Sequence, residues 1–233
     1  MQRPKTKDNK KIKYEFTGVT KTIKVNQRVI KVHQIKAISD FGVIKSGRLG
    51  GWIEKTENLS QYGNAWITEN VCVVDNAVCK GNAYVSGNSE GDAIISGSAI
   101  VADESTVFGN VNISGNAKIC DYARVRDHAK VADHATVKDW AEVSGNSIVC
   151  EDATVYYKAI VCGSAKVYGK ASVSGDAMIY GKAEVSGNAE VDGKASVYEY
   201  AKVGGSSRIS GAVRVHGNAE VEDTVAGKYE EIC

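Results

Sequence analysis

The hydrophobic pattern of this chain repeats every six residues from Ala93 to Ala219. Each repeat begins with a small residue, which is Ala in most cases and Ser or Val in the others, and a Val or Ile always stands two positions later. The residue between these two is usually polar or charged, as Glu184 is between Ala183 and Val185. Because successive side chains of a strand point to opposite faces, the small residue and the Val or Ile share one face, which we assign to the interior.

Each repeat ends in a corner. The residues that follow the Val or Ile commonly include Gly and then Asn or Lys, and Gly and Asn adopt positive φ angles at low cost. A period of six matches neither 3.5 nor 3.6 residues per turn, and Gly in every turn would destabilise a helix. The pattern therefore predicts an all-β protein of stacked repeats, in which very short strands are joined by corners.

Segments such as VSGNAEV at 185–191 carry a Val/Ile-x-Gly-x-Ala-x motif, and they make residues 61–223 similar to the hexapeptide-repeat proteins. This resemblance implies a left-handed parallel β-helix with three hexads in each coil. Residues 18 apart should then stack on neighbouring coils, about 4.8 Å from one another.

Four regions are expected along the chain: a disordered basic tail at 1–13, an N-terminal β cap at 14–60, the β-helix at 61–223 and a C-terminal tail at 224–233. The start of the cap alternates apolar and polar residues, which predicts two or three strands with turns near Gly18 and at 26–27. Between Ser89 and Ala93 the spacing shrinks from six residues to four. We interpret this as a tolerated deletion that shortens a corner or kinks a coil, in preference to a functional notch.

The segment that leads into the first coil resembles a narrower family. It has DF at 40–41, KSG at 45–47, GGWI at 50–53, LS at 59–60 and GNAWI at 63–67. These pieces match an uncharacterised family of hexapeptide-repeat proteins from bacteria and phages, which often carries a provisional transferase label. The first coil of a solenoid has unpaired edges, so we expect this region to cap it, with Phe41, Trp52 and Trp66 as candidate plugs. Ligand binding is an alternative role for Trp52.

Charge is unevenly distributed along the chain. Residues 1–36 hold 11 basic and 2 acidic residues, a net charge of +9, while the remainder carries −8 and the whole chain +1. A basic arm would attract an acidic partner such as nucleic acid, although a solubilising tail with compensating charges is the interpretation we prefer. The six cysteines show no CxxC spacing, so we expect free thiols in a cytoplasmic protein and no metal site. Apolar runs are too short for a membrane span, so we expect no membrane partner.

Acid–base chemistry has one candidate location. Between residues 121 and 140, the corners carry Asp followed by Tyr, His, His and Trp in turn. Many hexapeptide-repeat proteins are acyltransferases that use acyl-CoA and a His base near a projecting loop, and this resemblance implies His128 or His134 as the base. No residue is inserted after the irregular spacing, so we prefer to interpret both histidines as surface residues. Tyr122 and Trp140 are 18 apart and should stack.

One outward column is more apolar than the others. Sorting the outward residues by the 18-residue spacing places an apolar strip on one flat face: Phe108, Ile160, Cys162, Met178, Tyr180 and Tyr198. A contiguous exposed apolar strip often marks an interface. We expect a dimer or trimer formed through this strip, or a protein partner that covers it, and a coincidence of surface composition is the remaining alternative.

Two classes of function stay open. The first is a non-enzymatic scaffold or binding protein that needs no cofactor and uses the flat face to self-associate or hold a protein partner. The phage resemblance would make a host protein a suitable partner. The second class is an acyltransferase of the hexapeptide type with an acyl-CoA donor. Unbroken coils favour the first class, and a trimer with a cleft lined by His128 or His134 would favour the second.

Overall fold

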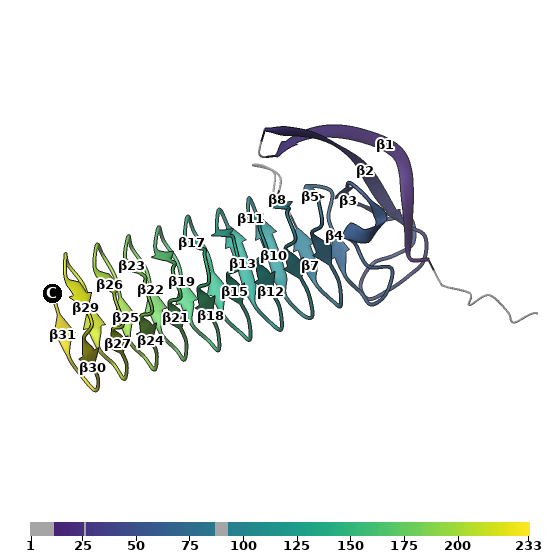
Figure 1. The fold of residues 1–233 in the computed structure, drawn as a ribbon. Helices are drawn as coiled ribbons and strands as arrows, with labels where there is room; N and C mark the ends of the chain where they lie inside the picture. The colour runs from purple at the N-terminus through teal and green to yellow at the C-terminus, as the bar shows by residue number, and fades with distance from the viewer. Residues whose placement is uncertain (1–11, 26, 87–92) are drawn as a thin grey trace, which may run out of the picture.

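The repeats form a parallel β-solenoid of about ten turns in a computed structural model that describes residues 12–25, 27–86 and 93–233 (Figure 1). Along the solenoid, each strand pairs in parallel with the strand three places further along, which builds three stacked sheets. The N-terminal strands β1, β2 and β3 pair antiparallel at one end of the largest sheet.

The twelve-stranded sheet contains, in order, β1 (Tyr14–Val25), β2 (Arg28–Ala37), β3 (Leu49–Ile53), β5 (Val71–Val73), β8 (Ala93–Ile95), β11 (Asn112–Ile113), β14 (Lys130–Val131), β17 (Ile148–Val149), β20 (Lys166–Val167), β23 (Glu184–Val185), β26 (Lys202–Gly204) and β29 (Glu220–Glu222). The ten-stranded sheet contains β4 (Trp66–Ile67), β7 (Tyr84–Ser86), β10 (Thr106–Gly109), β13 (Arg124–Asp127), β16 (Glu142–Val143), β19 (Ile160–Val161), β22 (Met178–Ile179), β25 (Ser196–Val197), β28 (Arg214–Val215) and β31 (Glu231–Ile232).

The nine-stranded sheet contains β6 (Val78–Cys79), β9 (Ile100–Val101), β12 (Lys118–Ile119), β15 (Thr136–Val137), β18 (Thr154–Val155), β21 (Ser172–Val173), β24 (Glu190–Val191), β27 (Arg208–Ile209) and β30 (Val225–Ala226). A single turn of 3₁₀ helix, η1, spans Thr56–Asn58. Within the described ranges, no helical segment has the length and apolar character needed to traverse a bilayer.

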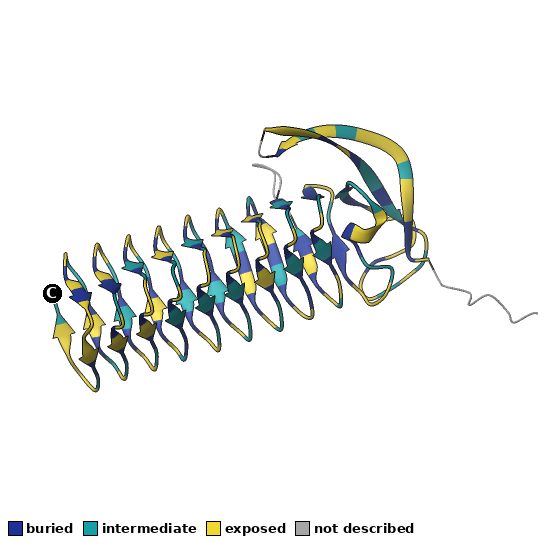
Figure 2. Ribbon diagram, viewed as in Figure 1, coloured by how far each residue is buried: buried dark blue, intermediate teal, exposed yellow. Residues whose placement is uncertain are grey.

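The predicted interior is confirmed. Ala183 and Val185 are fully buried, Glu184 between them is half-buried, and this alternation recurs from coil to coil (Figure 2). Val185 pairs with Val203, and the same offset between paired residues recurs along the regular coils. Each fully buried Val or Ile contributes about 1.5–3 kcal/mol, so the stacked interior is the main source of stability.

The corners share a left-handed backbone conformation, and some of them carry an acidic residue instead of Gly. Asp133 has φ +59° and Glu151 has φ +58°, close to the +71° of Gly169. The carboxylate of Asp133 accepts a hydrogen bond of 3.1 Å from the backbone N–H of Glu151 on the next coil, and Glu151 accepts one of 2.9 Å from Gly169. An acidic corner side chain therefore satisfies a backbone donor one coil further along.

The interpretation of the irregular spacing as a deletion is wrong. Val71 pairs with Ala93, and Tyr84 pairs with Thr106, so paired residues are 22 apart in this coil. The coil holds four residues more than a regular coil, and Ala93 takes the buried position that the six-residue count gave to Ser89. The predicted shortened corner falls on residues 87–92, which lie outside the described residues.

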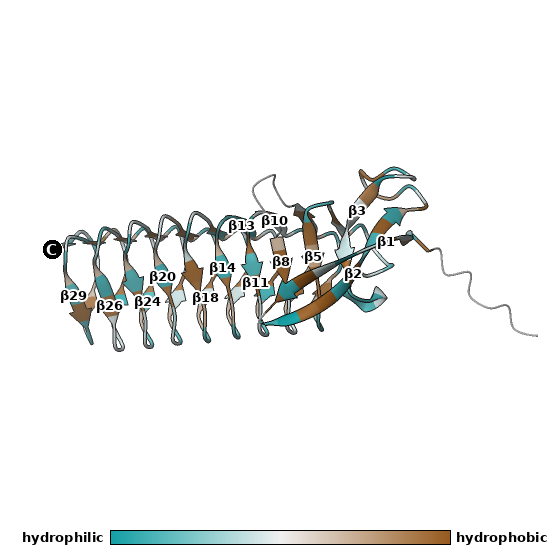
Figure 3. Ribbon diagram, turned by 90° about the horizontal axis from the view of Figure 1, so that it is seen from above, coloured by the Kyte–Doolittle hydropathy of each residue, from teal (hydrophilic) through white to brown (hydrophobic). Residues whose placement is uncertain are grey.

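The cap begins with a β-hairpin that lies over the outside of the first coils. Gln27 has φ +64° in the tight turn between β1 and β2, but the predicted turn near Gly18 is wrong. Strand β1 continues through Gly18, where a shift in register marks a bulge. Figures 1 and 3 show the hairpin arching across β5 and β8, where its Val32 packs with Val74 and half-buried Ile94.

The prediction of a C-terminal tail at 224–233 is wrong, because β30 and β31 continue the solenoid. Arg208 pairs with Val225, whereas the regular spacing would pair it with Ala226, so this coil is one residue shorter than the regular ones. The shortening moves the sequence out of the hexad frame. Ala226 takes the buried position that Ile209 holds on the previous coil, while Val225 points outward and is exposed.

Candidate functional site

The apolar strip lies on the outer face of the ten-stranded sheet. Ile160, Met178 and Ser196 are paired residues of β19, β22 and β25 and form one outward column. Met178 is 39% exposed and its two neighbours are half-buried. Because the strands are fixed by the sheet on both sides, these side chains sit on a rigid backbone.

A second column, at the corner after each strand, is aromatic. The rings of Tyr180 and Tyr198 stack with centroids 4.9 Å apart and planes within 1°, and His216 stacks on Tyr198 at 5.1 Å. Burial, and then the neighbouring Tyr198, raise the pKa of Tyr180. Burial also raises the pKa of Cys162, the next residue in this column, so its thiol stays protonated at neutral pH. From Cys162 to Tyr198 the column therefore presents uncharged side chains, and its two tyrosines are ordered by stacking.

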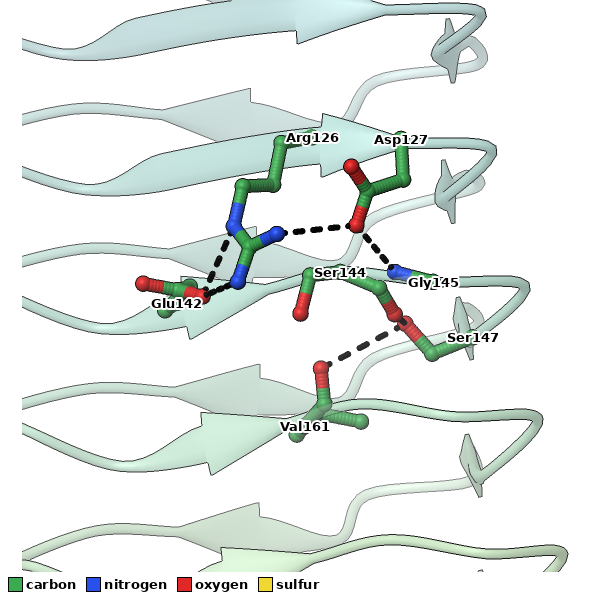
Figure 4. Close-up of polar contacts among 7 residues, drawn as sticks. All are labelled: Arg126, Asp127, Glu142, Ser144, Gly145, Ser147 and Val161. Carbon is green, nitrogen blue, oxygen red and sulfur yellow. Dashed lines mark hydrogen bonds and ion pairs between the residues drawn. The ribbon is translucent and has the colours of Figure 1, made fainter.

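An ion-pair network ends the strip on the side of the cap (Figure 4). The guanidinium of Arg126 donates to Oε1 of Glu142 at 2.9 Å and to Asp127 at 3.0 Å. These bonds, above all the one to Glu142, raise the pKa of Arg126. Phe108 lies beyond this network and pairs with Arg126, so it is separated from the main part of the strip.

His216 also lies on this face, although the predicted apolar strip did not include it. Its Nε2 is 3.0 Å from Oε1 of Glu231, and its Nδ1 is 4.0 Å from a carboxylate oxygen of Glu199. The signal was present in the sequence, because His216 follows Tyr198 by the length of one regular coil. A histidine between two carboxylates is the most connected acid–base group on this face.

The two candidate catalytic histidines are exposed at different corners. The carboxylate of Asp133 bonds to the next coil, and that of Asp127 accepts from Gly145 at 3.0 Å, so neither orients the His that follows it. Nε2 of His134 instead lies 2.9 Å from Nδ2 of Asn116. The structure therefore does not bring His128 and His134 together or pair either with the adjacent Asp.

The remaining corner residues of the 121–140 segment are structural neighbours. Tyr122 and Trp140 stack as predicted, with centroids 5.2 Å apart and planes within 2°. Near them, Asp103, Cys120 and Asp121 lie close enough to share a cation, but the carboxylate of Asp103 already accepts from the backbone of Asp121. Burial raises the pKa of Cys120 to about 11, which keeps it as a thiol, a poor metal ligand.

The proposed capping residues lie in two places. Phe41 packs edge-on against fully buried Trp66, with ring centroids 5.5 Å apart. Trp52 is half-buried beneath the hairpin, and its Nε1 donates to the carbonyl of Glu69 at 2.9 Å. Both tryptophans occupy the outward position of a strand, since Trp52 pairs with Cys72 and Trp66 with Tyr84. The cap thus covers Trp52 from outside the coil, while Trp66 belongs to the buried core cluster, and a plugging role for these residues stays a prediction.

Lys13, which the predicted boundary put in the disordered tail, is part of the cap. It is only 3% exposed, and its Nζ donates to the carbonyl of Ala65 at 2.7 Å and lies 5.1 Å from the centre of the Phe41 ring. Burial lowers its pKa to about 8. A long side chain from the N-terminal segment therefore satisfies a carbonyl at the first coil.

A hollow of about 420 Å³ lies over the twelve-stranded sheet and is lined by alternating charges. Lys166 pairs with Glu184 at 2.8 Å, and Lys202 pairs with Glu220 at 2.6 Å. Because these charges already compensate one another along the sheet, the hollow is less suited to a charged ligand than its lysines suggest.

No family model and no curated protein matches this chain. Function is therefore inferred from the surface itself.

Proposed function

We propose that this protein is a non-enzymatic scaffold or binding protein of the left-handed hexapeptide-repeat type, which uses the apolar strip to self-associate or to hold a protein partner. One observation carries the proposal. Over three consecutive coils, from Ile160 to Tyr198, the outward columns of the ten-stranded sheet hold no charged residue, and Met178 at their centre is exposed. Depletion of charge with enrichment of Met and Tyr is typical of interface cores.

The strip also has a low entropic cost of binding. Tyr180 and Tyr198 are stacked and half-buried, so few rotamers remain to be lost when a partner covers them. Tyrosine supplies apolar contact area together with a hydroxyl that can bond to a partner. A preorganised aromatic surface of this kind suits a protein partner better than a small solute.

The proposal also includes a cellular location and a kind of partner. Six free thiols are compatible with a cytoplasmic location, where thiols stay reduced. The resemblance of residues 40–67 to a bacterial and phage family makes a host protein the foreign partner to look for. The alternative, an acyltransferase that uses acyl-CoA, depends on His134, whose Nδ1 lies 3.8 Å from Oδ1 of Asp152, but both side chains are exposed to solvent.

The test is the double variant Met178→Glu with Tyr198→Glu, which adds two charges to the strip while both side chains point outward. A matched control, Ile148→Glu with Thr154→Glu, adds the same charge to outward positions of the other two sheets. Mass in solution is measured by light scattering, and partner capture is measured by pull-down. We expect the strip variant alone to lose its assembly or its partner. Unchanged mass together with unchanged capture would contradict the proposal.

A further inference from the structure

In the column that contains Met178, the charges that flank the apolar strip are arranged symmetrically about this residue. Along its column, Glu142 lies two coils before Met178 and Arg214 lies two coils after it. One coil further out, Arg124 and Glu231 occupy the corresponding positions. A charge on one side of Met178 is thus matched by the opposite charge at the same distance on the other side.

From this pattern we propose that two copies of the chain pack their ten-stranded sheets face to face and antiparallel, about a two-fold axis at Met178. The inference rests on the proposed function, because it takes the strip to be an interface, and it adds the partner and the geometry. An axis along the strand direction reverses the order of coils and keeps each column opposite itself. Glu142 then faces Arg214 of the second copy, and Arg124 faces Glu231 of the second copy.

The carboxylates are suited to this arrangement. Both hydrogen bonds from Arg126 to Glu142 use Oε1, and Figure 4 shows the other oxygen of Glu142 directed away from Arg126. Glu231 likewise contacts His216 through Oε1. Each carboxylate therefore offers its second oxygen to an arginine of the second copy. Arg124 and Arg214 are both exposed, and a guanidinium has donors for more than one acceptor.

A parallel arrangement conflicts with the same residues. A two-fold axis along the solenoid would place every coil opposite its own copy and exchange the two columns. Arg124 would then face Arg126 of the second copy, and Arg126 would face Arg124 of the second copy, so four guanidiniums would meet. Like charges opposed across an interface are strongly unfavourable, so the charge pattern selects the antiparallel geometry.

The size of the contact indicates its strength. From Arg124 to Glu231 the column spans six coil spacings, or about 29 Å at about 4.8 Å each, and two columns of side chains are about 15 Å wide. Two such faces bury on the order of 1,000 Å² in total, which is near the lower limit for a specific interface. We therefore expect a dimer that dissociates on dilution. The strip supplies its uncharged centre, with Met178 and Tyr180 each opposite its own copy and Cys162 opposite Tyr198 of the second copy.

Charge exchange tests the geometry. We measure the dimer dissociation constant by sedimentation for Glu142→Arg, for Arg214→Glu and for the double variant. In one chain these residues are four coils, about 19 Å, apart, so they cannot form a pair within a single copy. We expect each single change to weaken the dimer at least about tenfold and the double variant to return to within about threefold of the original. Arg124→Glu with Glu231→Arg repeats the test at the outer pair, in case loss of the Arg126 contact affects folding.

The outcomes separate this inference from the proposed function. Double variants that stay as weak as the singles, in chains whose melting is unchanged, would overturn the antiparallel geometry while leaving self-association intact. A wild-type chain that remains monomeric at every concentration would overturn the second copy as the partner. The proposed function would then stand only if Met178→Glu with Tyr198→Glu abolished capture of another protein.

Discussion

Corner Gly175 gives a direct test of why acidic residues can replace Gly in this fold. Its φ is +67°, and an added Cβ would lie 2.8 Å from the backbone N and O of Gly193 on the next coil. A left-handed conformation costs an ordinary L-residue about 1–2 kcal/mol, and relief of the contact adds to this cost. We expect Gly175→Ala to lower the free energy of unfolding by about 2 kcal/mol.

The same corner should tolerate Asp better than Ala. Asp visits the left-handed region more readily, and its carboxylate can accept from the N–H of Gly193, as Asp133 accepts from Glu151 at 3.1 Å. A hydrogen bond of this kind contributes about 1 kcal/mol, so Gly175→Asp should lose about half of what Gly175→Ala loses. The Asp176→Ala variant changes the exposed neighbour and serves as the control, with an expected effect within about 0.5 kcal/mol.

Denaturant and thermal unfolding followed by circular dichroism measure this order. For a chain of this length, about 2 kcal/mol corresponds to a fall in Tm of about 4–8 °C. If Gly175→Ala proves as stable as Gly175→Asp, the bond to the next coil does not explain the acidic corners, and the reasoning fails.

Three further outcomes are expected. Ala171→Glu buries a carboxylate at a position that is 1% exposed and should lower the free energy of unfolding by several kcal/mol. Lys170→Glu, at the exposed neighbouring position, should leave stability nearly unchanged. Equal melting temperatures for the two variants would contradict the assignment of Ala171 to the interior. Lys13 has a pKa of about 8 in the folded chain against an ordinary 10.5, so between these pH values the unfolded chain keeps a proton that the folded chain has lost. The free energy of unfolding, measured relative to Lys13→Met, should therefore rise by about 3 kcal/mol from pH 8 to 10.5 and be constant below pH 8. A difference between the two chains that does not change with pH would contradict this. Acetyl-CoA at millimolar concentration should not shift the Tm, and a shift of several degrees that His128→Ala or His134→Ala removes would instead favour the acyltransferase.

The regular coils could be predicted from the sequence because a period of six leaves few structural solutions. A small residue and a Val or Ile two positions apart define an inside face, and the stacking of every third repeat follows once three such units make a coil. This placed Met178, Tyr180 and Tyr198 in neighbouring coils of one face, and it also predicted the stacking of Tyr122 on Trp140. Such contacts are repeats of a local rule, so local sequence is sufficient to place them.

The exceptions to the period needed the tertiary structure. Ser89 keeps the six-residue count, so a four-residue insertion was indistinguishable from a deletion until the pairing of Val71 with Ala93 showed which residues stack. At the C-terminal end, one coil is a residue shorter than the others, so the residues after it no longer follow the six-residue count. Val225 then occupies an outward position, and the sequence pattern indicates that the solenoid has ended. Hydrogen bonds between neighbouring coils decide which residues pair, and the sequence of one coil does not determine these bonds.

The cap and the polar contacts of the candidate site also depend on non-local contacts. From the sequence, Lys13 is expected to be a solvated charge in a basic segment. In the structure, its burial is favourable because its Nζ donates to the carbonyl of Ala65, which is far along the chain. Similarly, Asp127 and Asp133 look like partners for the histidines beside them, yet their carboxylates bond to the next coil. The period alone determined the coils and the apolar strip, whereas the tertiary structure decided how the ends are closed and where each charge is paired, because those contacts join residues that no repeat relates.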